Sequence, residues 1–164
     1  MAVAARLLLV LATLGVAVAG AEPRPIVVAV DAGPRFFFTG GILARASVSG
    51  GYRWDRVEAS ADFAFGTGDH THTTEQSIAA GVRFFPGASC WELVLGWRFG
   101  HTRIRDTIGL EPITLHTFKA EFVPRIAFHR GAYEVRFAPV VAGGYLGQTW
   151  LLAVGPELGV ARTF

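Results

Sequence analysis

The chain contains a single cysteine, Cys90, and therefore cannot form an internal disulfide bond. A chain of this size without disulfides must draw its stability from another source. Beyond its first residues it also lacks any run of roughly 18 apolar residues, which excludes a transmembrane helix. The formal net charge is only +2, so no basic excess indicates nucleic-acid binding.

The first residues have the pattern of a secretory signal peptide. Arg6 is followed by the apolar run LLLVLATLGVAVA and then by the small residues Ala19, Gly20 and Ala21. The apolar run is too short to span a bilayer. We therefore predict that residues 1–21 are removed after Ala19 or Ala21, and that residues 22–164 form a single exported domain.

What remains is apolar and alternates with a period of two. In residues 91–99 (WELVLGWRF) the large apolar side chains occupy one parity, while Glu92 and Arg98 take the other. Successive side chains of a strand point to opposite faces, so this stretch is predicted to be a β-strand with one apolar face. The same alternation appears near residues 26–38, 42–54, 57–65, 77–84, 118–128, 133–142 and 150–164.

The charged residues of these segments lie on the face opposite the aromatic residues, apart from Arg162 near the C-terminal end. A soluble barrel would reverse this arrangement, so the apolar face requires a non-aqueous surrounding, which a bilayer supplies. The predicted fold is therefore all-β, an eight-stranded antiparallel up-and-down transmembrane β-barrel with a polar, side-chain-filled lumen. The predicted lumen charges are Asp31, Arg35, Arg45, Arg53, Glu58, Asp62, Arg83, Glu92, Arg98, Lys119, Glu121, Arg125, Glu134, Arg136 and Glu157.

Connections and aromatic residues fit this prediction. Tight turns are expected at 54–56, 86–89 and 129–132, other short ones near 39–41 and 143–145, and longer polar loops at 66–74 and 101–113. Short turns at one end and longer loops at the other are typical of outer-membrane barrels, as are aromatic girdles at the two interfaces. The predicted girdle residues are Tyr52, Trp54, Phe84, Trp91, Phe128, Tyr133, Phe164, Phe63, Phe65, Trp97, Phe99, Tyr145 and Trp150.

With this pattern the chain resembles the small eight-stranded outer-membrane proteins, such as the barrel of outer membrane protein A and its relatives. The terminal Phe164, preceded by Leu158 and Val160, resembles the signal that the barrel-assembly machinery reads, although Arg162 departs from it. The resemblance implies an outer-membrane location with both termini in the periplasm. It also implies a monomer that contacts outer-membrane lipids, lipopolysaccharide and the assembly machinery.

The lumen charges suggest what the barrel does. An eight-stranded interior is just wide enough for its own side chains, and each unpaired buried charge would cost several kcal/mol. The near balance of acids and bases predicts a salt-bridge network that closes the lumen. We therefore expect a structural or surface-interaction protein, and keep a narrow, porin-like channel of low conductance as the alternative. Arg103 and Arg105 in the predicted loop suit anionic head groups.

Catalytic and metal-binding patterns are weak. Lipid A deacylases carry a His and a Ser two residues apart on one strand, but here His116 precedes Phe118 and His101 precedes Arg103. A lipid A-modifying enzyme is therefore the least favoured hypothesis. The cluster at residues 69–72 (DHTH) could hold zinc or copper weakly, with Asp69 as a third ligand, but is interpreted as a polar loop. We expect no catalytic residue, cofactor or metal. Cys90 is expected to be a buried small residue of the lumen.

Overall fold

The computed structural model describes residues 26–84, 90–106, 113–146 and 149–164. The predicted signal peptide and the turn expected at 86–89 lie outside the described residues. Among the residues described, no helix is long and apolar enough to cross a membrane. The strands are β1 (Ile26–Phe37), β2 (Ile42–Trp54), β3 (Val57–Thr67), β4 (Thr71–Phe84), β5 (Trp91–Asp106), β6 (Ile113–Arg130), β7 (Tyr133–Leu146) and β8 (Thr149–Thr163).

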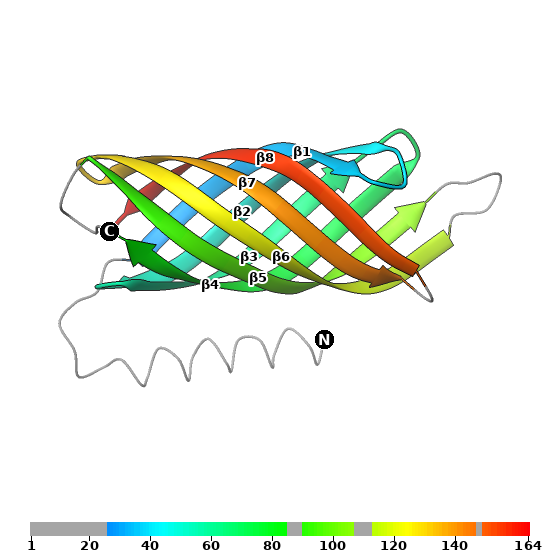
Figure 1. The fold of residues 1–164 in the computed structure, drawn as a ribbon, viewed down its shortest axis with the longest axis horizontal. Coiled ribbons are helices and arrows are strands. Elements are labelled where there is room, and N and C mark those ends of the chain that lie inside the picture. The colour runs from blue at the N-terminus through cyan, green and yellow to red at the C-terminus, as the bar shows by residue number, and fades with distance from the viewer. Residues whose placement is uncertain (1–25, 85–89, 107–112, 147–148) are drawn as a thin grey trace.

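These strands form one closed barrel in which each strand pairs antiparallel with the next and β8 returns to β1 (Figure 1). The predicted fold class, an all-β eight-stranded antiparallel barrel, is confirmed. The amide of Phe164 donates to the carbonyl of Ile26 at 2.8 Å, so the first and last described residues lie at the same end of the barrel. Closure leaves no strand edge with unpaired backbone groups, and the alternation of apolar and polar residues gives the wall two different faces.

The two faces of the wall differ sharply in burial. Along β8, Glu157 is 3% exposed, whereas its neighbour Leu158 is 62% exposed. The buried apolar side chains among the described residues are small groups such as Ala29 and Val94, which lie between the charged residues of the interior. The barrel therefore has a polar interior and an apolar outer wall, the inverse of a water-soluble barrel.

The strands around the predicted long loops extend farther than the sequence suggested. β3 ends at Thr67 and β4 begins at Thr71, so most of the loop predicted at 66–74 is strand. β5 continues to Asp106 and β6 begins at Ile113, which leaves only residues 107–112 for the loop predicted at 101–113. The prediction was wrong because polar composition was taken as a loop signal, whereas β-branched Thr and Ile residues, which are frequent in these stretches, favour strands.

Other local predictions had mixed outcomes. The turn after Trp54 and the turn at Gly131, where φ is +62°, lie where the sequence indicated. The short turn expected at 143–145 is wrong, because Tyr145 is still paired within β7, opposite Trp150. Cys90 was also wrongly expected to be buried: it is exposed and lies just before β5, beyond the packed interior.

Candidate functional site

The predicted lumen charges lie on the inner face of the barrel, at two levels of burial. Half-buried are Glu58, Arg83, Lys119 and Arg125. Buried are Asp31, Arg35, Arg45, Arg53, Asp62, Glu92, Arg98, Glu121, Glu134, Arg136 and Glu157.

Glu157 is the centre of an upper cluster of ion pairs, nearer the end that carries the long β5–β6 hairpin. Its carboxylate accepts hydrogen bonds from Arg35 of β1 and Arg45 of β2. Arg98 of β5 approaches the same carboxylate at 3.4 Å. One acid on β8 therefore contacts guanidinium groups from three other strands across the barrel axis, and bidentate guanidinium geometry suits such shared contacts.

Glu121 and Glu75 complete this upper cluster. Glu121 lies 2.7 Å from Arg98 and 3.2 Å from the Lys119 ammonium. Glu75 pairs with Arg45 at 2.8 Å and also with Lys119. Glu75 was not among the predicted lumen charges, because it directly follows the loop predicted at 66–74. Its odd-numbered parity, shared with Arg83 on the same strand, was the signal that could have found it.

A lower cluster lies toward the end of the barrel that holds Phe164. Arg83 contacts Glu92 at 2.6 Å, and Arg125 contacts Glu58 at 2.6 Å. Glu134 accepts from Arg136 at 2.6 Å and lies 2.9 Å from Arg53.

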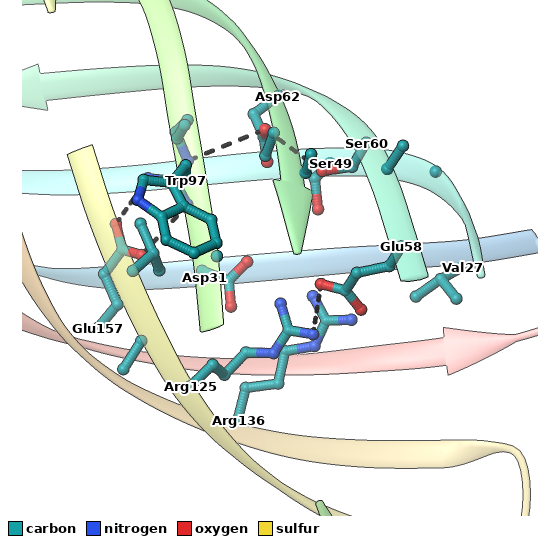
Figure 2. Close-up of a pocket in the computed structure, with 18 of the residues that line it drawn as sticks. Val27, Asp31, Ser49, Glu58, Ser60, Asp62, Trp97, Arg125, Arg136 and Glu157 are labelled. Carbon is teal, nitrogen blue, oxygen red and sulfur yellow. Dashed lines mark hydrogen bonds and ion pairs between the residues drawn. The ribbon is translucent and has the colours of Figure 1, made fainter. Parts of the chain in front are cut away.

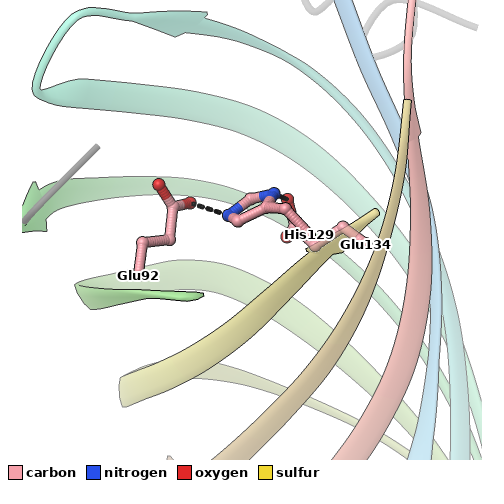
Figure 3. A group of neighbouring side chains, drawn as sticks. All are labelled: Glu92, His129 and Glu134. Atoms are coloured by element: carbon pink, nitrogen blue, oxygen red, sulfur yellow. Dashed lines mark ion pairs between the residues drawn. The ribbon is translucent and has the colours of Figure 1, made fainter. Parts of the chain in front are cut away.

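His129 belongs to this lower cluster although the sequence analysis assigned it to a turn. Figure 3 shows its ring between two carboxylates, with Nε2 at 3.5 Å from Glu92 and Nδ1 at 3.4 Å from Glu134. The ligand atoms of these three residues all lie within 4.8 Å of one another. However, Arg53 and Arg83 already engage the same carboxylates. A divalent cation would therefore have to compete with two guanidinium groups for the carboxylate oxygens. The three residues suit ion pairs better than a metal.

Between the two clusters lies a chamber of about 50 Å³, shown in Figure 2. At about 15 Å³ for one enclosed water, it has room for roughly three. The buried Nε atoms of Arg98 and Arg125 lack a hydrogen-bond partner among the described residues, and both side chains line this chamber. A second cavity of about 70 Å³ lies within the upper cluster, lined by Arg35, Glu75 and Lys119 among others. Arg98 and Glu157 line the first chamber, and Glu157 pairs with Arg35, which lines the second cavity.

The predicted girdle residues lie on the outer face. Trp54 is half-buried, and the other twelve are exposed, from 38% for Phe63 to 68% for Trp150. Cross-strand ring contacts such as Tyr145 with Trp150, 5.3 Å between centroids, join neighbours within the wall. Because β5 continues to Asp106, Trp97 lies well inside the strand rather than near its end.

Beyond Phe99 the outer face of β4–β6 becomes polar and basic. Arg103 and Arg105 are exposed there, with His72 on β4 and His116 on β6. His116 Nδ1 lies 3.1 Å from His101 Nε2, so this histidine contacts a second histidine on the neighbouring strand rather than a serine. His72 of the DHTH cluster contacts Thr67 at 3.2 Å. These residues lie on strands, and together they form the basic rim of the barrel.

Comparison with solved structures places this geometry in a class. Neisserial surface protein A has a TM-score of 0.64 at 15% identity, covering 88% of this chain and 99% of that one. The N-terminal β-barrel domain of Pseudomonas aeruginosa OprF has a TM-score of 0.63 at 16% identity, covering 84% and 97%. The outer-membrane enzyme PagL has a TM-score of 0.64 at 10% identity, covering 80% and 97%.

The chain thus has the fold of the small eight-stranded outer-membrane barrels, as the sequence pattern predicted. At these identities the likeness establishes the fold alone. No protein-family model matches the chain, and no curated protein matches it significantly in sequence.

Proposed function

We propose that the protein is an integral outer-membrane barrel with a structural and surface-interaction role, whose lumen is closed by its own ion pairs. The observation that carries this proposal is the inverted wall. Leu158 and Phe65 are more than half exposed, while Glu157 and Arg45 are each 3% exposed. Exposed apolar area on this scale is stable in lipid and unstable in water, and a closed barrel satisfies the strand backbone there.

Orientation follows from the ends of the barrel. The end with Phe164 and the tight turns at Trp54 and Gly131 would face the periplasm, and the extended β5–β6 hairpin would face outward. The terminal Phe164 would serve the barrel-assembly machinery, after removal of residues 1–21 and export. Short turns on the periplasmic side are the usual arrangement of such barrels.

The basic rim is the surface we propose for interaction. Arg103, Arg105 and His116 lie on the outer face just beyond Phe99, where head groups would meet the wall. On this face of β4–β6 the described residues beyond Phe99 include no acid, because the side chain of Asp106 has the opposite parity. Phosphate groups of outer-membrane lipopolysaccharide match this charge.

A low-conductance channel is the second candidate, favoured by the two internal cavities. Glu157 lines the first cavity and pairs with Arg35, which lines the second, so a rearrangement of this ion pair is the step that we expect to connect them. A lipid-modifying enzyme is less favoured, although PagL, at 10% identity, is an enzyme. The closest partner of His116 is His101 rather than a serine.

Membrane fractionation of cells that express the full chain tests the main proposal. We expect the protein in the outer-membrane fraction, with a folded form that migrates differently from the boiled form on a denaturing gel. Protease added to intact cells should cut near residues 107–112 and leave the strands intact. Recovery of the folded protein in a soluble fraction would overturn the proposal.

A further inference from the structure

Proline residues mark one part of the barrel wall. The prolines among the described residues are Pro34, Pro124, Pro139 and Pro156, and each lies inside a strand: β1, β6, β7 and β8 respectively. These four strands are consecutive around the closed barrel. Proline has no amide hydrogen to donate and is normally kept out of paired strands.

The four prolines stand in one cross-strand row. Pro139 lies directly opposite Pro156 in the β7–β8 ladder. Pairing between β1 and β8 stops at Ala32↔Leu158 and resumes at Phe36↔Val154, and the same register places Pro34 opposite Pro156.

The ladder between β6 and β7 is interrupted in the same way. Pairing between β6 and β7 stops at Phe122↔Val141 and resumes at Ile126↔Phe137, and this register places Pro124 opposite Pro139. All other ladders of the barrel are unbroken over the described residues.

The hydrogen-bond phase explains why pairing fails at these two places. Phe38 donates to Leu152 at 3.0 Å and Phe164 donates to Ile26 at 2.8 Å, so even-numbered residues exchange bonds between β1 and β8. In an antiparallel ladder such pairs recur at every second residue. Pro34 and Pro156 therefore occupy a position where each should donate to the other, and neither can.

The β6–β7 ladder has the same defect. His129 of β6 donates to Cys90 at 2.7 Å, so odd residues of β6 bond toward β5 and even residues bond toward β7. Pro124 and Pro139 thus face each other without a donor on either side. We call the unpaired stretch between β1 and β8, residues 33–35 and 155–157, the seam window. We call the unpaired stretch between β6 and β7, residues 123–125 and 138–140, the β6–β7 window.

The two strands lie very close together at the seam window although its hydrogen bonds are missing, because each strand has a glycine there. A Cβ on Gly33 would lie 1.9 Å from the Pro156 carbonyl oxygen, and one on Gly155 would lie 1.9 Å from the Pro34 oxygen. Only glycine allows the carbonyl groups to sit so near the facing backbone. Arg35 donates to Pro34 at 3.4 Å from the inner face, a long contact that replaces little of the missing bond.

The internal chamber lies directly behind these windows. Val123, Arg125 and Ala138 of the β6–β7 window line it, and so does Glu157 of the seam window. Figure 2 shows Arg125 and Glu157 on its wall. The windows therefore lie between the lipid-facing surface and the polar interior.

We propose that the β7–β8 pair is a movable panel that parts from β6 and β1 at the two windows and opens the chamber sideways to the membrane. The proposal rests on the membrane placement given above. The opening would admit small head groups that donate hydrogen bonds, such as an ammonium or hydroxyl group. The window edges offer carbonyl acceptors, and the charged residues described around the chamber are Asp31, Glu58, Asp62 and Glu157 against Arg98, Arg125 and Arg136.

Cysteine labelling in lipid vesicles tests the panel. In a Cys90→Ser background, Ala138→Cys places a thiol at the β6–β7 window, where Ala138 is 3% exposed. Ala64→Cys is the matched control, because Ala64 is 1% exposed on β3 between unbroken ladders. A maleimide that partitions into the bilayer should label Ala138→Cys at least about tenfold faster, because opening at this window breaks two fewer hydrogen bonds than opening at an unbroken ladder.

Equal labelling of the two thiols would overturn the panel. So would labelling of Ala138→Cys by a membrane-impermeant maleimide alone, because the reagent would then have entered through an end of the barrel. Dodecylamine in the vesicles should slow the labelling, and dodecyl methyl ether at the same membrane fraction should not. Equal effects of the two additives would contradict the head-group selectivity.

Restoring the missing donors provides the second test. Pro124→Ala with Pro139→Ala returns two amide hydrogens to the β6–β7 window and should slow the labelling of Ala138→Cys. Val48→Ala, on the fully paired side of the barrel, should leave it unchanged. Undiminished labelling after the proline replacements would refute the panel.

Hydrogen exchange needs no substitution. In the unmodified protein in vesicles, the amides of Phe122, Ile126, Phe137 and Val141 should exchange faster than those of Ala46, Val48, Phe63 and Phe65. Equal protection in a protein that still fractionates with the membrane would overturn the panel and leave the proposed function standing. Loss of membrane association would instead overturn the proposed function.

Discussion

Glu157 and Arg98 meet across the axis of the barrel, from β8 and β5, with Oε2 and Nη2 3.4 Å apart. The two residues are 59 positions apart in the sequence. Arg35 and Arg45 contact the same carboxylate, so three guanidinium groups share Glu157, which lines the first cavity while Arg35 lines the second. Loss of the Glu157 carboxylate charge is therefore expected to affect both the stability of the barrel and the closure of its lumen.

Glu157→Gln should destabilise the barrel and open it to ions. Removing one partner of a buried ion pair costs about 3–5 kcal/mol, because the other charges stay buried without compensation. Urea unfolding in vesicles, followed by tryptophan fluorescence, measures the loss. Planar-bilayer recording should show new anion-selective openings. Glu58→Gln, in the more exposed lower cluster, is the control and should have a smaller effect. Unchanged stability would contradict the role assigned to Glu157.

The pair formed by Glu75 and Lys119 should be energetically coupled. Both side chains are at most 8% exposed, and they are in direct contact. A double-mutant cycle with Glu75→Gln and Lys119→Met should give a coupling energy of about 1–3 kcal/mol. A second cycle pairs Glu75→Gln with Arg53→Met, a substitution in the lower cluster. Its coupling energy should be less than about 0.5 kcal/mol. Coupling of equal size in the two cycles would show that the clusters are not distinct.

Charge on the outer wall should oppose insertion. Leu158 is 62% exposed on the apolar face, and an arginine near the middle of a lipid-facing strand costs about 2–4 kcal/mol. Leu158→Arg should therefore lower the unfolding free energy in vesicles by this amount, whereas Leu158→Met should change it little. A fully tolerated arginine would mean that this face does not contact lipid.

The basic rim should bind anionic head groups. Each arginine near a charged surface contributes about 1 kcal/mol, so Arg103→Ala and Arg105→Ala should each weaken lipopolysaccharide binding roughly fivefold. The effect should shrink as salt is added, because exposed charges are screened. Arg130→Ala, at the opposite end of the barrel, is the control. An equal loss with Arg130→Ala would indicate a nonspecific charge effect.

Much of this architecture could be predicted from local sequence. Whether a residue has an odd or an even number determines which face of its strand it takes, as for Glu92 and Arg98. This prediction requires only that the segment is a strand. Strand ends were harder to predict, because the polar stretches beyond Phe99 and before Ser77 pair as strands while resembling loops. Glu75 was missed for this reason, and His129 was missed because β6 extends into the turn predicted at 129–132.

The row of prolines lay beyond local reasoning for a different cause. Each proline is visible in the sequence, but their alignment depends on the register of four strands. Register is set by the hydrophobic pattern and by the turn geometry of each hairpin, and the pairing of β1 with β8 also requires closure across almost the full chain. Pairing partners in the lumen, such as Arg98 with Glu157, depend on the same closure.

The most direct test of the inverted wall is the local environment of successive side chains along one strand. Spin labels placed singly at residues 57–65 of β3, in a Cys90→Ser background in lipid vesicles, report accessibility to oxygen and to a water-soluble nickel complex. We predict oxygen accessibility that alternates with a period of two, with maxima at Val57, Ala59, Ala61, Phe63 and Phe65. Maxima for the nickel complex at these positions, or no alternation at all, would contradict the account.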